Sequence, residues 1–175
     1  SIAPQGIYME LGTYHAKSAM SALQGLDDGV FWLVDPILEN IRVYSQVLKT
    51  LMNISKSGTA MATFAKSSVD VIPLCDCFAY VMVDGGDHDS LVMEEVKLLE
   101  NRMDKFGIIV FRDYNSRLVK EAYEYLIKTG KYENIPIEWD KIIKYVNENN
   151  LELNHQTWHH QEMQNQNFVA AVRRK

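Results

Sequence analysis

The chain has 175 residues, and 47% of them are hydrophobic, so it can bury the core of one domain. Its 18 basic and 23 acidic residues give a net charge of −5, which disfavours sequence-independent binding of nucleic acid, because that requires clustered Lys and Arg. No apolar run approaches the roughly 20 residues of a membrane span, and the first residues lack the basic-then-apolar order of a signal peptide. We therefore expect a single domain over residues 1–175 with neither nucleic acid nor membrane as partner.

The two cysteines, Cys75 and Cys77, are separated by one residue. This spacing is too short for an ordinary disulfide, and the sequence nearby lacks the further ligands of a zinc site. We interpret both as free thiols in a reducing compartment, which favours a cytoplasmic protein. The chain begins at Ser1 and enters a strand-like run at Ile7, so we expect that an N-terminal cap segment of the gene product is absent.

Short β-rich runs alternate with longer helical patterns in the first half of the chain. This pattern predicts strands at 7–11, 31–34 and 60–65, helices at 17–26 and 37–53, and a short helix or turn at 69–74. The longer helix is predicted because its apolar residues recur every three or four positions. Pro36 disfavours helical geometry at the preceding residue, so Asp35 is expected to stay extended at the tip of its strand.

The second half continues the alternation, with strands predicted at 78–83 and 108–111 and helices at 89–103, 116–129 and 139–149. Two further strand-like runs, 151–158 and 168–173, flank a polar linker and are predicted to form a hairpin. Strands that alternate with helices indicate an α/β fold, with a parallel sheet covered by helices on both faces. The hairpin predicts an antiparallel pair at the edge of that sheet.

Acidic residues stand where the first two predicted strands end. Glu10 is a candidate acceptor for a ligand ammonium group, and Gly12 permits a tight turn and close approach of a ligand to the backbone. An ordinary turn between strand and helix is the alternative. Asp35 follows at about the distance, roughly 20 residues, at which an acid holds ribose hydroxyls in nucleotide-binding sheets. The alternative for Asp35 is an N-cap ahead of Pro36.

Two more acids, Asp84 and Asp113, follow the strands at 78–83 and 108–111. Neighbouring strand tips would bring these carboxylates together, which favours a divalent cation such as Mg²⁺; independent turn acids are the alternative. His88 is a candidate general base or ligand contact, or a plain loop histidine. Tyr114 and Asn115 are candidate pocket residues, with turn chemistry as the alternative.

Four segments together resemble class I S-adenosylmethionine-dependent methyltransferases. In chain order they are Tyr8-Met-Glu-Leu-Gly-Thr-Tyr14, Leu33-Val-Asp-Pro36, Val81-Met-Val-Asp-Gly-Gly-Asp-His88 and Gly107-Ile-Ile-Val-Phe-Arg-Asp-Tyr114. The third segment resembles the Asp-Gly-x-His signature of a small O-methyltransferase-like branch. The resemblance covers residues 7–173. It implies a Rossmann-like three-layer α/β/α sandwich with a mostly parallel seven-stranded sheet of order 3-2-1-4-5-7-6, in which the seventh strand is antiparallel.

The resemblance also implies roles for individual residues. The implied contacts of S-adenosylmethionine are Glu10, Gly12, Thr13 and Tyr14 at the methionine end, Asp35 at the ribose, Ser67 and Ser68 near the adenine, and Asp84. The implied catalytic residues are Asp84 and His88, and metal-dependent members of the family would bind a divalent ion through Asp84 and Asp113.

Three positions depart from the family pattern. The glycine-rich first loop reads His15-Ala16-Lys17 instead of continuing with glycine, and Ser67 replaces an acid near the adenine. Arg112 stands where the family has histidine, and an arginine cannot replace a metal-ligating histidine because it offers no lone pair.

The leading hypothesis is an enzyme that transfers a methyl group from S-adenosylmethionine to an oxygen, or with lower expectation a nitrogen, of a small molecule. The alternative is a catalytically degenerate protein of the same fold that binds the cofactor or a related nucleoside. A nicotinamide-dependent dehydrogenase is a weaker hypothesis, because the first turn lacks a three-glycine fingerprint. A homo-oligomer is kept as an alternative to a monomer.

Overall fold

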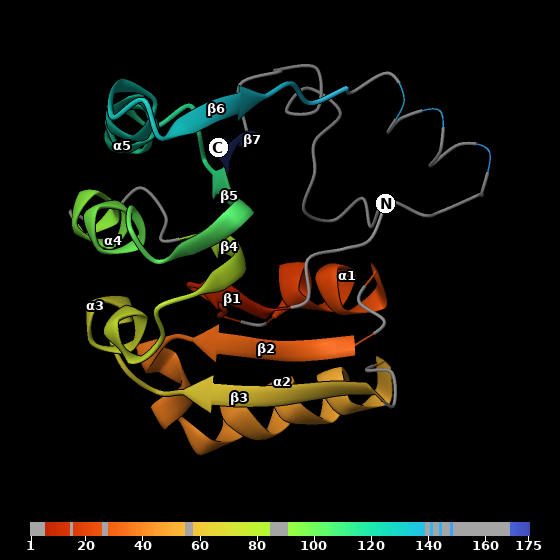
Figure 1. Ribbon diagram of the computed structural model, residues 1–175. Helices are drawn as coiled ribbons and strands as arrows, with labels where there is room; N and C mark the ends of the chain where they lie inside the picture. Colours follow the sequence, from red (N-terminus) through yellow and green to blue (C-terminus); the bar gives the residue numbers. More distant parts are fainter. Residues whose placement is uncertain are drawn as a thin grey trace.

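The computed structural model of the protein describes residues 6–14, 16–25, 28–54, 58–84, 91–138, 141, 144, 148 and 169–175. Its elements alternate along the chain, as the sequence pattern predicts (Figure 1). The strands are β1 (Ile7–Leu11), β2 (Asp28–Val34), β3 (Gly58–Phe64), β4 (Phe78–Val83), β5 (Met103–Arg112), β6 (Tyr132–Ile135) and β7 (Val169–Arg174). The helices are α1 (Lys17–Gly25), α2 (Ile41–Ile54), α3 (Ser68–Val71), α4 (Val92–Leu99) and α5 (Arg117–Lys128), with 3-10 turns η1 (Pro36–Glu39) and η2 (Ile72–Leu74).

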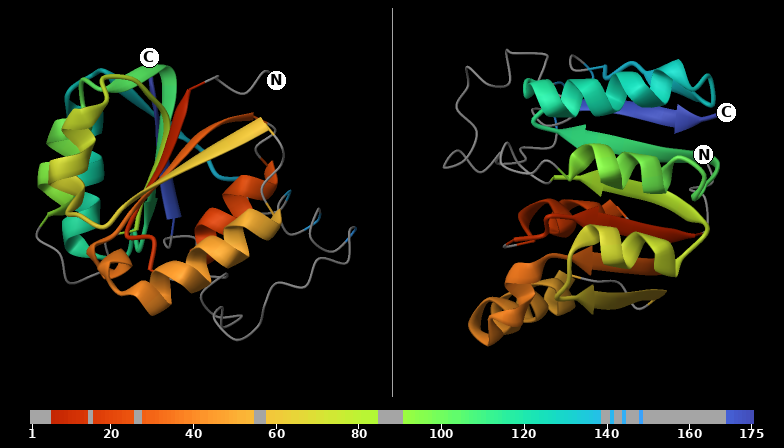
Figure 2. Two further views of the ribbon diagram at one scale, coloured as in Figure 1. Left: turned by 90° about the horizontal axis from the view of Figure 1, so that it is seen from below. Right: turned by 90° about the vertical axis from the view of Figure 1, so that its left-hand side faces the viewer.

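All seven strands form one sheet with the order β3-β2-β1-β4-β5-β7-β6. The pairs among β1 to β5 are parallel, and β7 is antiparallel to both of its neighbours, β5 and β6. Figure 2 shows β7 running against the strands beside it. The Rossmann-like three-layer sandwich and its strand order are therefore confirmed.

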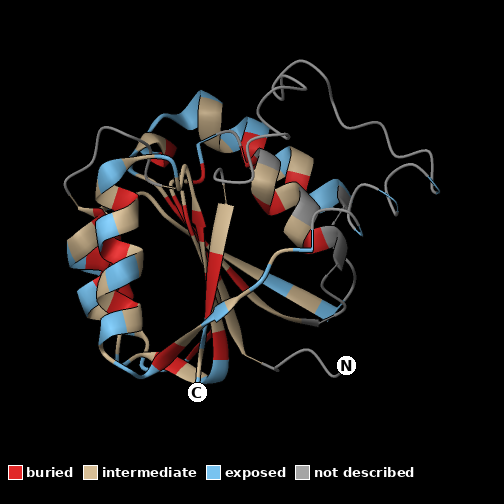
Figure 3. Cartoon of the chain, turned by 90° about the horizontal axis from the view of Figure 1, so that it is seen from above, coloured by how far each residue is buried: buried red, intermediate tan, exposed pale blue. Residues whose placement is uncertain are grey.

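Helices cover both faces of the sheet, with α1 and α2 on one side and α3, α4 and α5 on the other (Figure 2). Each side has its own apolar core. The first core packs Leu23 of α1 and Leu51 of α2 against Phe31 and Leu33 of β2. On the second side, α5 buries Val119, Ala122 and Leu126, which recur at helical spacing and therefore lie on one face. Figure 3 shows these buried stripes facing the sheet.

Several predicted boundaries are wrong at helix ends. The helix predicted at 37–53 is split at Asn40 into η1 and α2, because Asn40 has an extended backbone, with φ −74° and ψ 107°, and its Oδ1 accepts from Arg42 N at 3.1 Å. The helix predicted at 89–103 is described only from Val92 to Leu99, and Met103 already belongs to β5. Asp35 itself is extended, with φ −165° and ψ 128°, as Pro36 predicts.

The predicted hairpin is wrong in its pairing. The strand after residue 168 is confirmed as β7, but it lies between β5 and β6 and pairs with both. β6 is a four-residue strand at Tyr132–Ile135 that the sequence pattern did not predict. The run at 151–158 lies outside the described residues, as does most of the helix predicted at 139–149. Within the described part of the chain, no helix is long and apolar enough to cross a membrane.

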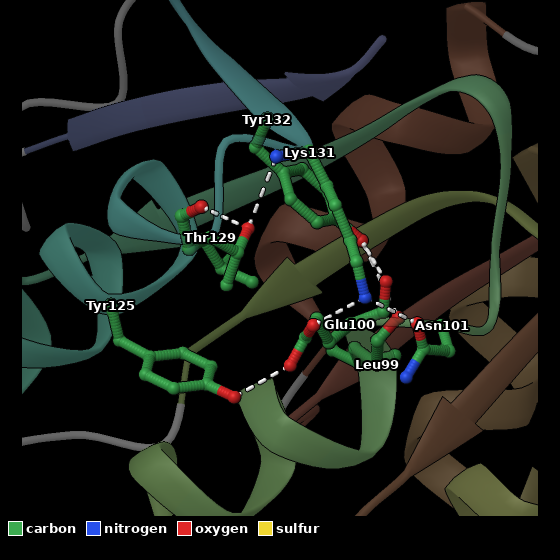
Figure 4. A network of polar contacts seen from close by, with 8 residues as sticks. Leu99, Glu100, Asn101, Tyr125, Thr129, Lys131 and Tyr132 are labelled. Carbon is green, nitrogen blue, oxygen red and sulfur yellow. Dashed lines mark hydrogen bonds and ion pairs between the residues drawn. The ribbon is translucent and has the colours of Figure 1, made fainter.

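A polar network ties the end of α4 to the turn between α5 and β6 (Figure 4). Glu100 accepts hydrogen bonds from Tyr125 Oη at 2.5 Å and from Lys131 Nζ at 2.6 Å, and Lys131 Nζ also reaches Asn101 Oδ1 at 2.8 Å. Tyr132, which is 1% exposed, donates to the Glu100 carbonyl at 2.9 Å. These bonds satisfy carbonyl and carboxylate oxygens that the end of α4 would otherwise leave without protein donors.

We expect Tyr132→Phe to lower the free energy of unfolding by about 1 kcal/mol, because the phenyl ring keeps the packing but removes a buried donor. Urea unfolding followed by circular dichroism measures the difference. Tyr123→Phe is the matched control, because its hydroxyl bonds Asn134 Oδ1 at an exposed position. An equal loss in both variants would contradict the role given to the buried hydroxyl.

Candidate functional site

The site lies where the parallel strands end at one edge of the sheet. Leu11 of β1 pairs with Val34 of β2 on one side and with Val83 of β4 on the other, and Val83 pairs with Phe111 of β5. The residues that follow these positions are therefore brought side by side. Backbone bonds fix them further: Gly12 N donates to Val34 O at 2.9 Å, and Asp84 N donates to Leu11 O at 3.0 Å.

The four acids predicted to converge are Glu10, Asp35, Asp84 and Asp113. They come from the ends of β1, β2, β4 and β5, which lie next to one another in the sheet. The predicted convergence at one edge is therefore confirmed by the strand order and register. The contacts of each acid determine which groups it can bind.

The turn after β1 has an unusual backbone. Gly12 has φ 82°, and two residues that are not glycine, Tyr14 and Ala16, also have positive φ, at 43° and 58°. A side chain in this left-handed region costs about 1–2 kcal/mol, so the turn holds strain that glycine would avoid. Ala16 is fully buried, whereas Tyr14 is 57% exposed. The loop therefore keeps a left-handed backbone at Tyr14 and Ala16, although neither is glycine. His15, between them, lies outside the described residues.

The carboxylate of Asp35 links the turn after β1 to the start of η1. Its Oδ2 accepts from Tyr14 N at 2.7 Å, and its Oδ1 accepts from Ile37 N at 2.9 Å. The N-cap that was the alternative for this residue is present. Because a carboxylate has about four acceptor positions, two remain for hydroxyl groups of a ligand. Asp35 is thus both a cap and a fixed acceptor.

The two serines expected near an adenine follow β3, next to Asp35 along the edge. Asp35 N donates to Phe64 O, the last residue of β3, at 3.1 Å. Ser67 precedes α3 and is half-buried, and its hydroxyl makes no cap bond; Ser68 is 8% exposed. Thr13, also among the expected contacts, is 2% exposed, and its hydroxyl donates to the Glu10 carbonyl at 3.4 Å.

Glu10 is a buried carboxyl group, with 1% of the residue exposed. Ser18 of α1 donates to Oε1, while Oε2 has no hydrogen-bond partner among the described residues. Burial raises the pKa of Glu10 to about 8, and the charge of Asp84 adds to the rise, whereas the bonds from Ser18 and Thr13 and the charge of Arg112 oppose it. At neutral pH the side chain is therefore mainly protonated, with one oxygen left for a ligand.

Asp84 forms an ion pair with Arg112, the last residue of β5. Arg112 Nη1 lies 2.7 Å from Asp84 Oδ2, and the side chains are 37% and 9% exposed. Burial is the largest cause that raises the pKa of Asp84, and the charge of Asp113 adds to it; the hydrogen bond from Arg112 opposes the rise. The distance is that of a charge-assisted hydrogen bond. The pair was not predicted from the sequence, in which Arg112 stands out only because it replaces the histidine of the family pattern.

The described residues do not fit the predicted divalent metal site at Asp84 and Asp113. No group of three or more metal-ligating side chains occurs among them. One Asp84 oxygen is held by a guanidinium, which is cationic and has no lone pair to donate to a metal. Asp113 follows Arg112 directly and has a left-handed backbone, with φ 54°. Among the described residues Asp84 is therefore held in an ion pair, and the metal site at Asp84 and Asp113 stays a prediction.

For the remaining predicted residues, the structure describes the position of Tyr114 and Asn115 but not that of His88. His88 lies outside the described residues, which stop at Asp84 and resume at Leu91. Tyr114 lines a pocket of about 270 Å³ at the ends of β5 and β6 and the start of β7; Asn115 does not. The other lining residues are Tyr123, Asn134, Ile135, Pro136, Ile137, Val169 and Ala170. The sequence could not reveal this pocket, because one wall depends on the unpredicted strand β6.

Comparisons with known proteins identify the fold. No protein-family model and no curated protein matches the chain. Solved structures do match. The chain is 17% identical to a precorrin-6y C5,15-methyltransferase from Geobacter metallireducens, with a TM-score of 0.55 over 75% of this chain and 66% of that one. It is 10% identical to an rRNA methylase from Streptococcus thermophilus, with a TM-score of 0.58 over 97% of this chain and 87% of that one.

A third structure, a putative methyltransferase from Thermoplasma acidophilum, is 12% identical, with a TM-score of 0.60 over 100% of this chain and 70% of that one. Identities of 10–17% carry the fold and not the reaction. The chain therefore has the fold of these methyltransferases, and its chemistry must be argued from the edge described above.

We expect the protein to become less stable as the pH rises, because the folded state holds a proton on Glu10 that the unfolded state has already released. The pKa of this group is higher in the folded state, about 8, than its ordinary value of 4.5, so the folded state binds more protons over that interval. Stability from this group is thus fully present below about pH 4.5 and falls by roughly 3 kcal/mol by pH 7. Glu10→Gln, which resembles the protonated form, should remove this part of the pH dependence.

Urea unfolding of both proteins at pH 5, 6, 7 and 8 measures the effect as the difference between wild type and variant at each pH. Other titrating groups are shared by the two proteins and cancel in that difference. A difference that stays constant from pH 5 to pH 8 would show that Glu10 is ionised in the folded protein.

Proposed function

We propose that this protein binds S-adenosylmethionine along the carboxyl edge of its sheet and transfers the methyl group to an oxygen of a small molecule. The single observation that carries the proposal is the meeting of Glu10, Asp35 and Asp84 around the turn at Gly12, in a chain with a methyltransferase fold. In open α/β sheets, ligands bind beyond the carboxyl ends of the strands where the strand order reverses. Here that point lies between β1 and β4.

The residues at this edge fit the parts of the cofactor. Oε2 of Glu10 is buried and has no partner among the described residues, so it suits the ammonium group of the methionine end, whose charge would favour the ionised carboxylate. The remaining acceptor positions of Asp35 suit the ribose hydroxyls. Ser67 and Ser68, next along the edge, are the proposed adenine-side contacts, and Thr13 and Tyr14 belong to the turn around the methionine end.

When bound, the cofactor supplies a sulfonium that already activates the methyl carbon. The protein has then to align the acceptor hydroxyl and to remove its proton. His88, which follows Asp84 in the sequence, is the proposed base. Asp84, held by Arg112, is proposed to orient the reacting groups. The pocket beside Tyr114 and Tyr123 is the proposed acceptor site, since its volume of about 270 Å³ suits a small molecule.

Charge favours a small acceptor over RNA. One matched structure is an rRNA methylase, but this chain carries a net charge of −5. Three acids, Asp35, Asp84 and Asp113, stand at the edge with Glu10, and Arg112 is already paired with Asp84. Phosphate backbones require clustered positive charge, which these residues do not provide.

A second function, cofactor binding without transfer, is favoured by one observation. The turn after β1 places Tyr14 and Ala16 in the left-handed conformation that glycine adopts freely, so added side chains narrow the space around a ligand. Calorimetry with S-adenosylhomocysteine combined with a screen of phenols, catechols and amines separates the two. Binding with no product from any acceptor would favour this second function.

We expect Asp35→Asn to weaken binding of S-adenosylhomocysteine at least about tenfold, because an amide provides one acceptor oxygen where the carboxylate provides two. Isothermal titration calorimetry measures the change. Asp70→Asn on the exposed side of α3 is the matched control and should bind as the wild type does. Absence of binding by the wild type would refute the proposed cofactor site itself.

We expect His88→Ala to lower kcat for methyl transfer about a hundredfold while the affinity for S-adenosylhomocysteine changes less than threefold, because a general base acts on the acceptor and not on the cofactor. Release of S-adenosylhomocysteine from an acceptor found in the screen gives the rate. His155→Ala is the control for loss of a histidine elsewhere in the chain. Near-normal turnover by His88→Ala would remove this residue from the mechanism.

A further inference from the structure

We propose that the guanidinium of Arg112 is the built-in counter-ion of Asp84, standing where a divalent cation would otherwise bind, so that this edge of the sheet works without a metal. The inference goes beyond the proposed methyl transfer. It rests on the contacts of Arg112 and can be tested without any cofactor or acceptor.

The strand register makes the pair a fixed part of the fold. Val83 of β4 pairs with Phe111 of β5, so Asp84 and Arg112 are the next two residues of the same parallel ladder. Their side chains meet in the layer just beyond the strands, with Nη1 and Oδ2 separated by 2.7 Å. Asp84 N donates to Leu11 O at 3.0 Å, so the backbone of Asp84 is anchored from the β1 side.

Burial of Asp84 favours Arg112 over a metal ion as the cation beside it. The Asp84 side chain is only 9% exposed, so water does little to stabilise its charge, and a nearby cation is required. Arg112 meets that requirement permanently, because a guanidinium does not lose its proton in proteins and offers donors alone. Neither Mg²⁺ nor Mn²⁺ could approach the same oxygen without displacing or repelling this group. The favoured cation at Asp84 is therefore the side chain and not an ion from solution.

Among the described residues, the oxygens around the pair are also too few for a hard cation. Mg²⁺ prefers six oxygen ligands in octahedral geometry. In that part of the chain, the acids near Asp84 are Asp113, the residue after Arg112, and Glu10, whose Oε1 already accepts from Ser18. Both of these acids interact electrostatically with the guanidinium. The same guanidinium charge thus acts on all three acidic side chains that a metal at this edge would have to share.

A merely structural ion pair would predict lost stability on mutation and nothing more. A counter-ion that excludes metal predicts, in addition, a new metal site when its charge is removed. The measurement is a titration of cofactor-free protein with Mn²⁺, followed by electron paramagnetic resonance, up to 1 mM, roughly the concentration at which weak surface sites fill. We expect the wild type and Asp84→Asn to bind Mn²⁺ equally, because Asp84 provides no site. We expect Arg112→Gln to bind Mn²⁺ at least tenfold more tightly than the wild type does, at a site that requires Asp84.

Arg117→Gln removes the same charge from an exposed position on α5, where the side chain is 84% exposed, and should gain no such site. Arg112→Lys, which keeps a cation near Asp84, should gain none either. An Asp84-dependent Mn²⁺ site in the wild type would overturn the proposal, and so would a folded Arg112→Gln that gains no site. If Arg112→Gln does not fold, an Asp84-dependent Mn²⁺ site in the wild type, absent from Asp84→Asn, would still overturn the proposal. None of these outcomes depends on methyl transfer.

Discussion

The position of β1 between β2 and β4 is the constraint on which the rest of the molecule depends. From β1 the chain builds outward through β2 and β3, then crosses back to place β4 and β5 on the opposite side. Parallel pairing on both flanks of β1 puts the loops after β1 and β4 next to each other, and the bond from Asp84 N to Leu11 O closes that junction. Without this reversal of direction, Glu10 and Asp84 would lie in separate parts of the sheet and no common site would form.

Gathering several acids at one edge creates repulsion, and the protein resolves it in three different ways. Glu10 keeps its proton, because burial raises its pKa to about 8. Asp35 is stabilised by two backbone amides, those of Tyr14 and Ile37. Asp84 is neutralised by Arg112. The edge therefore contains carboxyl groups in three electrostatic states, which are the partners required by the ligand proposed above.

The sequence revealed most of the fold because local and tertiary preferences agree in β1 to β5 and in α5, where apolar periodicity and buried faces coincide. It could not reveal β6, since Tyr132–Ile135 is only four residues long. This strand is defined by pairing with β7 residues that lie 36 to 42 positions further on, and not by its own pattern. The acids could be located because each stands at or just after the end of a strand. The Arg112 pair was not predicted, although the strand order was, because the sequence does not tell which partner a charged side chain at a strand end contacts. Proton retention by Glu10 likewise depends on burial, which results from the packing of the folded chain around β1.

The insertion of β7 between β5 and β6 has a consequence for how the protein reaches its final form. β6 touches the rest of the sheet only through β7, and β7 comes last among the described strands. While the polypeptide emerges from the ribosome, β1 to β5 can pair in the order in which they are made, but β5 keeps an open edge until residues 169–174 arrive. During that interval the flank beside the pocket is exposed to pairing with foreign strands, which is the hazard of any uncovered sheet edge. Completion of the β6–β7 side of the sheet is therefore expected to be the slow, late event of biogenesis, well after the β1–β3 side has formed.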